Sequence, residues 1–75
     1  MSNGMKELLI LSTTLKELRE KQGYTQKYVA ERLGIRYQSY QAYELGLTVP
    51  TLHNFIKLAD IYDVSLDYLI GRENI

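Results

Sequence analysis

Hydrophobic residues recur at helical spacing in short stretches of the chain, and each stretch ends at a residue that suits a helix terminus. In the clearest stretch, Val29, Ala30 and Leu33 fall on one face of a helix. Thr25 precedes them, and its side-chain oxygen can accept hydrogen bonds from the free amides of a first helical turn. Gly34 follows them, and glycine readily adopts the left-handed conformation that ends a helix. The pattern therefore predicts a short helix between Thr25 and Gly34.

Similar start and stop signals divide the rest of the chain. Thr14 and Glu17 form a capping box, in which the threonine caps a helix and the glutamate bonds back to the threonine amide. Thr51, which follows Pro50, and Ser65 are suitable caps for two later helices. The fold class is therefore all-α, a compact domain of five helices, which are predicted over residues 15–22, 26–33, 37–44, 52–62 and 66–70.

The apolar positions of these helices define the expected core. Its members are expected to be Leu15, Leu18, Tyr40, Tyr43, Leu52, Phe55, Ile56, Ala59 and Tyr62. Tyrosines at the core boundary, half-buried with a wet hydroxyl, are expected to be Tyr24, Tyr28 and Tyr68.

Residues 5–11 fit the helical scheme poorly, because an apolar run stops before the cap at Thr14. A short apolar run of this kind can form a strand, although a single strand needs a partner. The alternatives are a frayed tail or an extra helical turn folded on the core. We divide the chain into an N-terminal segment that could supply a dimerisation strand, a main domain and a tail, over residues 1–14, 15–71 and 72–75.

Composition narrows the function classes. The chain has 75 residues and no cysteine, which indicates one small domain without disulfides and fits a cytoplasmic protein. The longest apolar run, residues 8–11, is far too short for a membrane span. The sequence has no nucleophile–base pair, glycine-rich phosphate loop or metal cluster, so we expect neither an enzyme nor a cofactor. His53 is expected to be solvated, with a phosphate contact as the alternative.

The second and third predicted helices are joined by a short turn that contains Gly34. Two helices linked in this way form the helix-turn-helix used to read DNA. The outward face of the third helix carries Gln38, Ser39 and Gln41, whose side chains can hydrogen-bond base edges.

The net formal charge is zero, which opposes strong non-specific binding to nucleic acid. The charge is unevenly distributed, however. Residues 1–36 carry seven Lys and Arg against four Glu, whereas residues 37–75 carry two against five acidic residues. Such a bipolar molecule can present its positive end to phosphate.

The ordered set of motifs between Leu15 and Gly71 is more specific than any one of them. The segments that carry it are 15–21, 23–26, 29–35, 43–46, 50–52, 58–59 and 64–71. In this order they resemble the phage repressor and Cro type of helix-turn-helix protein, the Xre family. The resemblance implies a compact, lambda-repressor-like five-helix domain that is dimeric on DNA.

The resemblance also assigns roles to individual residues. Gln26 would contact a DNA phosphate at the start of the second helix, where helix N-termini attract anions. Arg19 and Glu44 match a partly buried ion pair that ties the first helix to the third. Tyr37 could stack, contact a thymine methyl group or cap the core. The implied DNA-contacting set is Gln26, Lys27, Arg36, Tyr37, Gln38, Ser39, Gln41 and Ala42.

Three features depart from the family pattern. Tyr40 stands where a smaller aliphatic residue is usual, so the core beneath it must be repacked. After Arg36 the third helix has no Arg or Lys, so bidentate guanine contacts would have to come from Arg36 alone. The loop over residues 46–50 lacks basic residues, which implies weaker binding and a shallower salt dependence.

Two functions follow as hypotheses. The first is a sequence-specific transcriptional regulator of double-stranded DNA, a repressor that binds a palindromic operator as a homodimer. The dimer would form through residues 5–12 or through the C-terminal helices around Leu66, Leu69 and Ile70. The second is a protein-interaction module, such as the antitoxin partner of a toxin, with weak or secondary DNA binding. The glutamines of the third helix favour the first hypothesis. The neutral net charge and the apolar loop that contains Leu45, Leu47 and Val49 favour the second.

Overall fold

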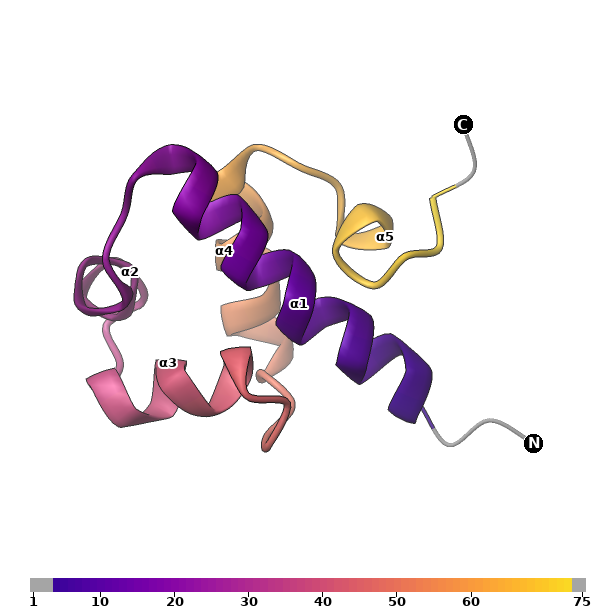
Figure 1. Ribbon diagram of the computed structural model, residues 1–75, viewed down its shortest axis with the longest axis horizontal. Helices are drawn as coiled ribbons and strands as arrows, with labels where there is room; N and C mark the ends of the chain where they lie inside the picture. The colour runs from indigo at the N-terminus through magenta and orange to yellow at the C-terminus, as the bar shows by residue number, and fades with distance from the viewer. Residues whose placement is uncertain (1–3, 74–75) are drawn as a thin grey trace.

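In the computed structural model, the described part of the chain, residues 4–73, forms five helices and no strand: α1 (Met5–Gln22), α2 (Gln26–Leu33), α3 (Tyr37–Glu44), α4 (Leu52–Tyr62) and α5 (Leu66–Leu69). α1 runs diagonally across the molecule, and α2 and α3 lie at its left-hand end in Figure 1. α5 lies on the other side, where it packs against α1 and α4 (Figure 1). The prediction of an all-α, five-helix domain is confirmed.

Side-chain caps begin three of the helices where the sequence predicts them. The hydroxyls of Thr25, Thr51 and Ser65 each accept a hydrogen bond from the amide three residues later, at 3.0, 3.2 and 2.9 Å. These bonds satisfy amides that have no partner within the helix. α2 and α3 have the predicted bounds, and α5 ends one residue earlier, at Leu69.

α1 corrects the expectation for the N-terminal segment. It begins at Met5, so the predictions of a helix start at Thr14 and of a strand over residues 5–11 are both wrong, and residues 5–11 form additional helical turns on the core. Leu11 and Leu15 are four residues apart on one helical face, and both are buried in the common core. Burial along this continuous face outweighs the local capping signal at Thr14, which stays inside the helix.

Gly71 fixes α5 against the N-terminal half of α1. Its φ of 73° is left-handed, and a Cβ atom there would lie 2.9 Å from Cδ1 of Ile10. Glycine allows this close approach because it has no side chain and accepts the positive φ. Ile10 and Leu11, which the sequence placed in the N-terminal segment, therefore pack against the rest of the domain.

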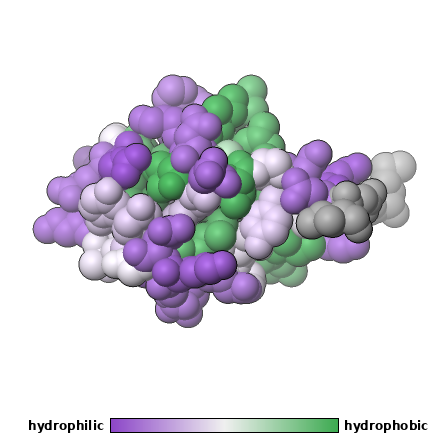
Figure 2. Space-filling model, turned by 90° about the horizontal axis from the view of Figure 1, so that it is seen from above, coloured by the Kyte–Doolittle hydropathy of each residue, from purple (hydrophilic) through white to green (hydrophobic). Residues whose placement is uncertain are grey.

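The core contains the three tyrosines predicted for it, Tyr40, Tyr43 and Tyr62, together with eight aliphatic residues. α4 buries Leu58, Ala59 and Tyr62, and Phe55 packs against this core in a partly buried position. The predictions for Leu52 and Ile56 are therefore wrong, since these side chains are 71% and 43% exposed. Tyr24 is half-buried as predicted, whereas two others predicted at the boundary are exposed, Tyr28 and Tyr68. Space-filling representation shows hydrophobic patches reaching the surface among polar residues (Figure 2).

Within residues 4–73 there is no helix of the length and hydrophobicity needed to cross a membrane. The same part of the chain has no group of three potential metal-ligating side chains. His53 is exposed near the start of α4.

Candidate nucleic-acid interface

α2 and α3 form a helix-turn-helix unit whose turn is fixed by backbone bonds. Gly34 has a φ of 73° and its amide donates to the Glu31 carbonyl at 3.1 Å. The Ile35 amide donates to the Ala30 carbonyl at 3.0 Å, which completes a Schellman motif, and the Ile35 side chain packs on the core. Arg36 has an extended backbone and is the N-cap residue that directly precedes α3. The turn therefore holds α3 across α2 with one side open to solvent.

One side of α3 borders a shallow, open depression in the surface. Four residues of the predicted DNA-contacting set line it together: Arg36, Gln38, Ser39 and Ala42. Gln38 and Ser39 are exposed, so their polar groups are accessible to a ligand. We refer to these four residues as the reading face of α3.

The reading face continues into the connection between α3 and α4, where Thr48 and Thr51 also line the depression. Sequence reasoning missed both threonines as candidate contacts. It assigned Thr51 only as a cap and judged the loop by its lack of basic residues. Two threonines shortly after the third helix could have indicated DNA contacts from the sequence, because hydroxyl groups can bond phosphate oxygens. Their position beside Gln38, however, depends on how the connection folds back.

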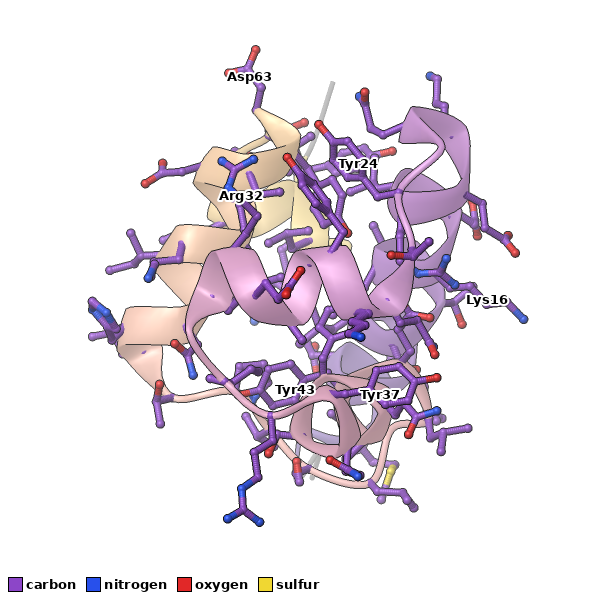
Figure 3. All side chains as sticks on the ribbon, turned by 90° about the vertical axis from the view of Figure 1, so that its left-hand side faces the viewer. Lys16, Tyr24, Arg32, Tyr37, Tyr43 and Asp63 are labelled. Atoms are coloured by element: carbon purple, nitrogen blue, oxygen red, sulfur yellow. The ribbon has the colours of Figure 1, made fainter. Side chains whose placement is uncertain are left out.

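The opposite side of α3 is hydrogen-bonded to α2 through Gln26, Tyr37 and Gln41, which we call the glutamine clasp. Gln41 Nε2 donates to the Tyr37 hydroxyl at 3.0 Å and to Gln26 Oε1 at 3.5 Å. The Tyr37 hydroxyl donates to Gln26 Oε1 at 3.4 Å. Figure 3 shows Tyr37 between the ribbons of α2 and α3. Lys27, the remaining predicted contact, is exposed in the first turn of α2.

An ion pair between α1 and α3 lies next to the clasp. Arg19 Nε donates to Glu44 Oε2 at 2.7 Å and Arg19 Nη2 donates to Glu44 Oε1 at 3.1 Å, so the contact is bidentate. The Tyr40 hydroxyl donates to Glu44 Oε2, and Gln26 Nε2 donates to Glu44 Oε1 at 3.0 Å. Tyr40 also contacts the Tyr62 hydroxyl at 3.3 Å. Glu44 thereby joins the core, the first helix and the clasp.

Burial and hydrogen bonding set the charge states in this network. Only 3% of the Glu44 side chain and 13% of the Arg19 side chain are exposed. Desolvation by itself raises the pKa of Glu44, but hydrogen bonds from Arg19, Tyr40 and Gln26 outweigh it and hold this pKa below its ordinary value. The hydrogen bond to Glu44 raises the pKa of Arg19. Burial, followed by the bond to Glu44, raises the pKa of Tyr40 far above its usual range. Glu44 is therefore ionised and Tyr40 protonated at neutral pH.

The fold and this surface define a helix-turn-helix domain of the phage repressor and Cro type. The chain belongs to the helix-turn-helix family, whose sequence profile matches residues 15–69. The resemblance stated from the sequence is thus confirmed, and the family is one of DNA-binding regulators and not of enzymes.

Several regulators are similar to this chain in sequence. The HTH-type transcriptional regulator ImmR of Bacillus subtilis is 42% identical over 65 residues, which cover 87% of this chain and 51% of the regulator. The HTH-type transcriptional regulator AnsR of the same organism is 42% identical over 59 residues, which cover 79% of this chain and 51% of AnsR. The cryptic phage CTXphi transcriptional repressor RstR of Vibrio cholerae is 44% identical over 48 residues, which cover 64% of this chain and 43% of RstR. The chain spans about half the length of these curated relatives.

Proposed function

We propose that this chain is a sequence-specific, double-stranded DNA-binding transcriptional regulator that acts as a repressor in the cytoplasm. The observation that carries the proposal is the accessible polar side of α3, which the helix-turn-helix turn leaves open to solvent. In this arrangement the second helix of the motif lies in the major groove, and the first crosses the phosphate backbone. The repressor RstR among the relatives supports this direction of regulation.

The proposed interface divides the contacts by chemistry. Gln38, Ser39 and Ala42 would face base edges, and Arg36 would supply a charged contact at the start of α3. Gln26 and Lys27 would approach phosphates, because the first amides of α2 point out of the helix. The full proposed DNA-contacting set is Gln26, Lys27, Arg36, Tyr37, Gln38, Ser39, Gln41 and Ala42.

Selection from randomised duplex DNA, followed by sequencing, tests the proposal. We expect enrichment of one motif, with two-fold symmetry if the protein binds as a dimer. Bound duplexes that show no common sequence would contradict sequence-specific regulation.

Gln26→Ala is expected to weaken binding to every duplex by a similar factor. A phosphate contact positions the protein but carries no sequence information. Fluorescence anisotropy at low salt, with the selected duplex and a scrambled one, measures both affinities. Lys16→Ala is a control for removing an exposed polar side chain outside α2 and α3, because Lys16 is exposed on α1. Unchanged affinity in Gln26→Ala would remove Gln26 from the interface.

We also propose a homodimer through the apolar groove of about 480 Å³ between α1, α4 and the connection before α4. Val49 and Leu52 line it and are 70% and 71% exposed. Residues 45–52 carry no charge, and Glu7 is the one charged residue among the described residues that line the groove, so an interface there would contain few like-charge contacts. A dimer that reads two successive major grooves needs its recognition helices about 34 Å apart, and this spacing is the requirement that the proposed interface must meet. Residues 5–12 would contribute as one wall of the groove, in helical form.

Replacing Val49 and Leu52 together by serine is expected to shift the protein toward monomer in analytical ultracentrifugation. The same variant should lose more affinity for a palindromic site than for a half-site, because it loses the energy of pairing. Leu66→Ser is the matched control on the C-terminal helices, where Leu66 is 37% exposed. Dissociation in the control, with the Val49 and Leu52 variant still dimeric, would assign the dimer to α5.

A second function remains a candidate because one observation favours it. Three aliphatic residues of the connection after α3 are 70–73% exposed: Leu45, Leu47 and Val49. Exposed apolar residues at this density indicate a protein contact, as an antitoxin makes with its toxin. Analytical ultracentrifugation of the wild type distinguishes this function from a homodimer, because a surface used only to bind another protein leaves the purified chain monomeric.

A further inference from the structure

We infer that Gln41 is a positioning residue, which holds the Gln26 side chain toward a DNA phosphate instead of reading a base. This inference rests on the proposed function. It starts from the direction of the Gln41 amide, whose Nε2 donates to Tyr37 at 3.0 Å and to Gln26 at 3.5 Å. Gln38, by contrast, lies on the reading face and is exposed.

Glu44 determines which way the Gln26 amide points. A carboxylate that is ionised only accepts hydrogen bonds, so the NH₂ group of Gln26 must face it. Glu44 itself cannot turn away, because Arg19 and Tyr40 hold both of its oxygens. The carbonyl oxygen of Gln26 is therefore directed to the other side, where it needs donors.

α3 supplies these donors from one face. Tyr37, Gln41 and Glu44 are spaced at i, i+4 and i+7, which places them in a row along a helix. Tyr37 and Gln41 each donate to Gln26 Oε1, while Glu44 accepts from Gln26 Nε2. The Gln26 amide is thus held at both ends by a single helix.

One amide hydrogen of Gln26 remains for a ligand. Nε2 carries two hydrogens, and Glu44 takes one of them. The other belongs to the first residue of α2, and the free amides of a first helical turn attract an anion. Gln41 therefore contributes to phosphate binding through Gln26, and α3 is divided into a clasp side and a reading side.

A double-mutant cycle tests the inference in the intact chain. Gln41→Met keeps the length of the side chain and removes its donor, and we expect about 2- to 10-fold weaker binding to the selected and scrambled duplexes alike. In a Gln26→Ala background, Gln41→Met should have no further effect, since its role passes through Gln26. Gln38→Met is the matched control on the reading face. It should weaken only the selected duplex and should add to Gln26→Ala.

A loss confined to the selected duplex, or additive with Gln26→Ala, would overturn the inference by making Gln41 a base-reading residue. The side-chain NH₂ signals of Gln26 in the free protein give a readout that needs no DNA. We expect Gln41→Met to move them in ¹⁵N-resolved NMR spectra and Gln38→Met to leave them in place. Unchanged signals in Gln41→Met would also overturn the inference. If the wild type bound no duplex while the signals moved, the clasp would stand, but the proposed function and the phosphate role would fall.

Discussion

Replacing Arg19 or Glu44 alone by alanine is expected to lower the free energy of unfolding by about 3–5 kcal/mol, because each change leaves an unpaired charge in the interior. The Glu44 side chain is 3% exposed and accepts hydrogen bonds from Arg19, Gln26 and Tyr40. Water therefore cannot fully solvate the carboxylate when Arg19 is removed. Thermal and urea melts of the two single variants measure the loss. Melting curves equal to that of the wild type would show that the pair contributes no stability.

The double variant Arg19→Leu with Glu44→Leu separates the energy of the pair from the cost of burying one charge. We expect it to recover much of the lost stability, since the attraction within a buried ion pair offsets little more than the cost of desolvating its two charges. Tyr40 would keep Tyr62 as a hydrogen-bond partner in this variant. A double variant as unstable as the singles would mean that the apolar pair cannot pack between α1 and α3.

The lowered pKa of Glu44 gives a second measurement of the same network. The stability that the ionised carboxylate contributes is present above the ordinary glutamate pKa of about 4.3, and it is lost as the pH falls through the lower value in the folded protein. Glu44→Gln should therefore flatten the acid side of the stability profile. An unaltered profile would show that other carboxylates dominate acid unfolding.

Gln38→Ala is expected to weaken binding to the selected duplex by about 1–3 kcal/mol and to leave binding to scrambled DNA nearly unchanged. Gln38 is exposed on the reading face, so its amide is free to pair with a base edge in the major groove. Titrations of both duplexes at the same salt concentration provide the comparison. Equal losses on the two duplexes would show that Gln38 contacts the backbone and not a base.

A similar substitution at Ser39 is a useful contrast, because both residues are exposed on the same side of α3. A serine hydroxyl can bond a phosphate oxygen as well as a base edge. Ser39→Ala could weaken binding to both duplexes while Gln38→Ala weakens binding to the selected duplex alone. This result would show that the DNA backbone crosses the reading face at Ser39.

The sequence by itself determined the elements whose signals are local. Thr25, Thr51 and Ser65 bond to amides three residues ahead, so their caps need no information from elsewhere in the chain. Gly34 likewise ends α2 through its own backbone conformation. The order of these local motifs was sufficient to predict five helices, the helix-turn-helix and the family.

The tertiary structure decided the features that depend on packing between distant segments. Thr14 carries a cap signal, yet α1 continues through it because Leu11 and Leu15 bury one continuous face against the core. The sequence pattern did not predict which face of α4 is buried, because Leu52 and Leu58 are both apolar. Packing against the neighbouring helices buries Leu58 and leaves Leu52 exposed.

The division of α3 into a clasp side and a reading side is also a tertiary property. Gln38 and Gln41 are chemically identical and three residues apart, and the sequence treated both as base-reading residues. They differ because Gln26 of α2 bonds to the side of α3 that carries Gln41 and Glu44, whereas the side that carries Gln38 is open. A side chain's role depends on which partners the fold brings within hydrogen-bonding distance, and periodicity alone does not contain that information.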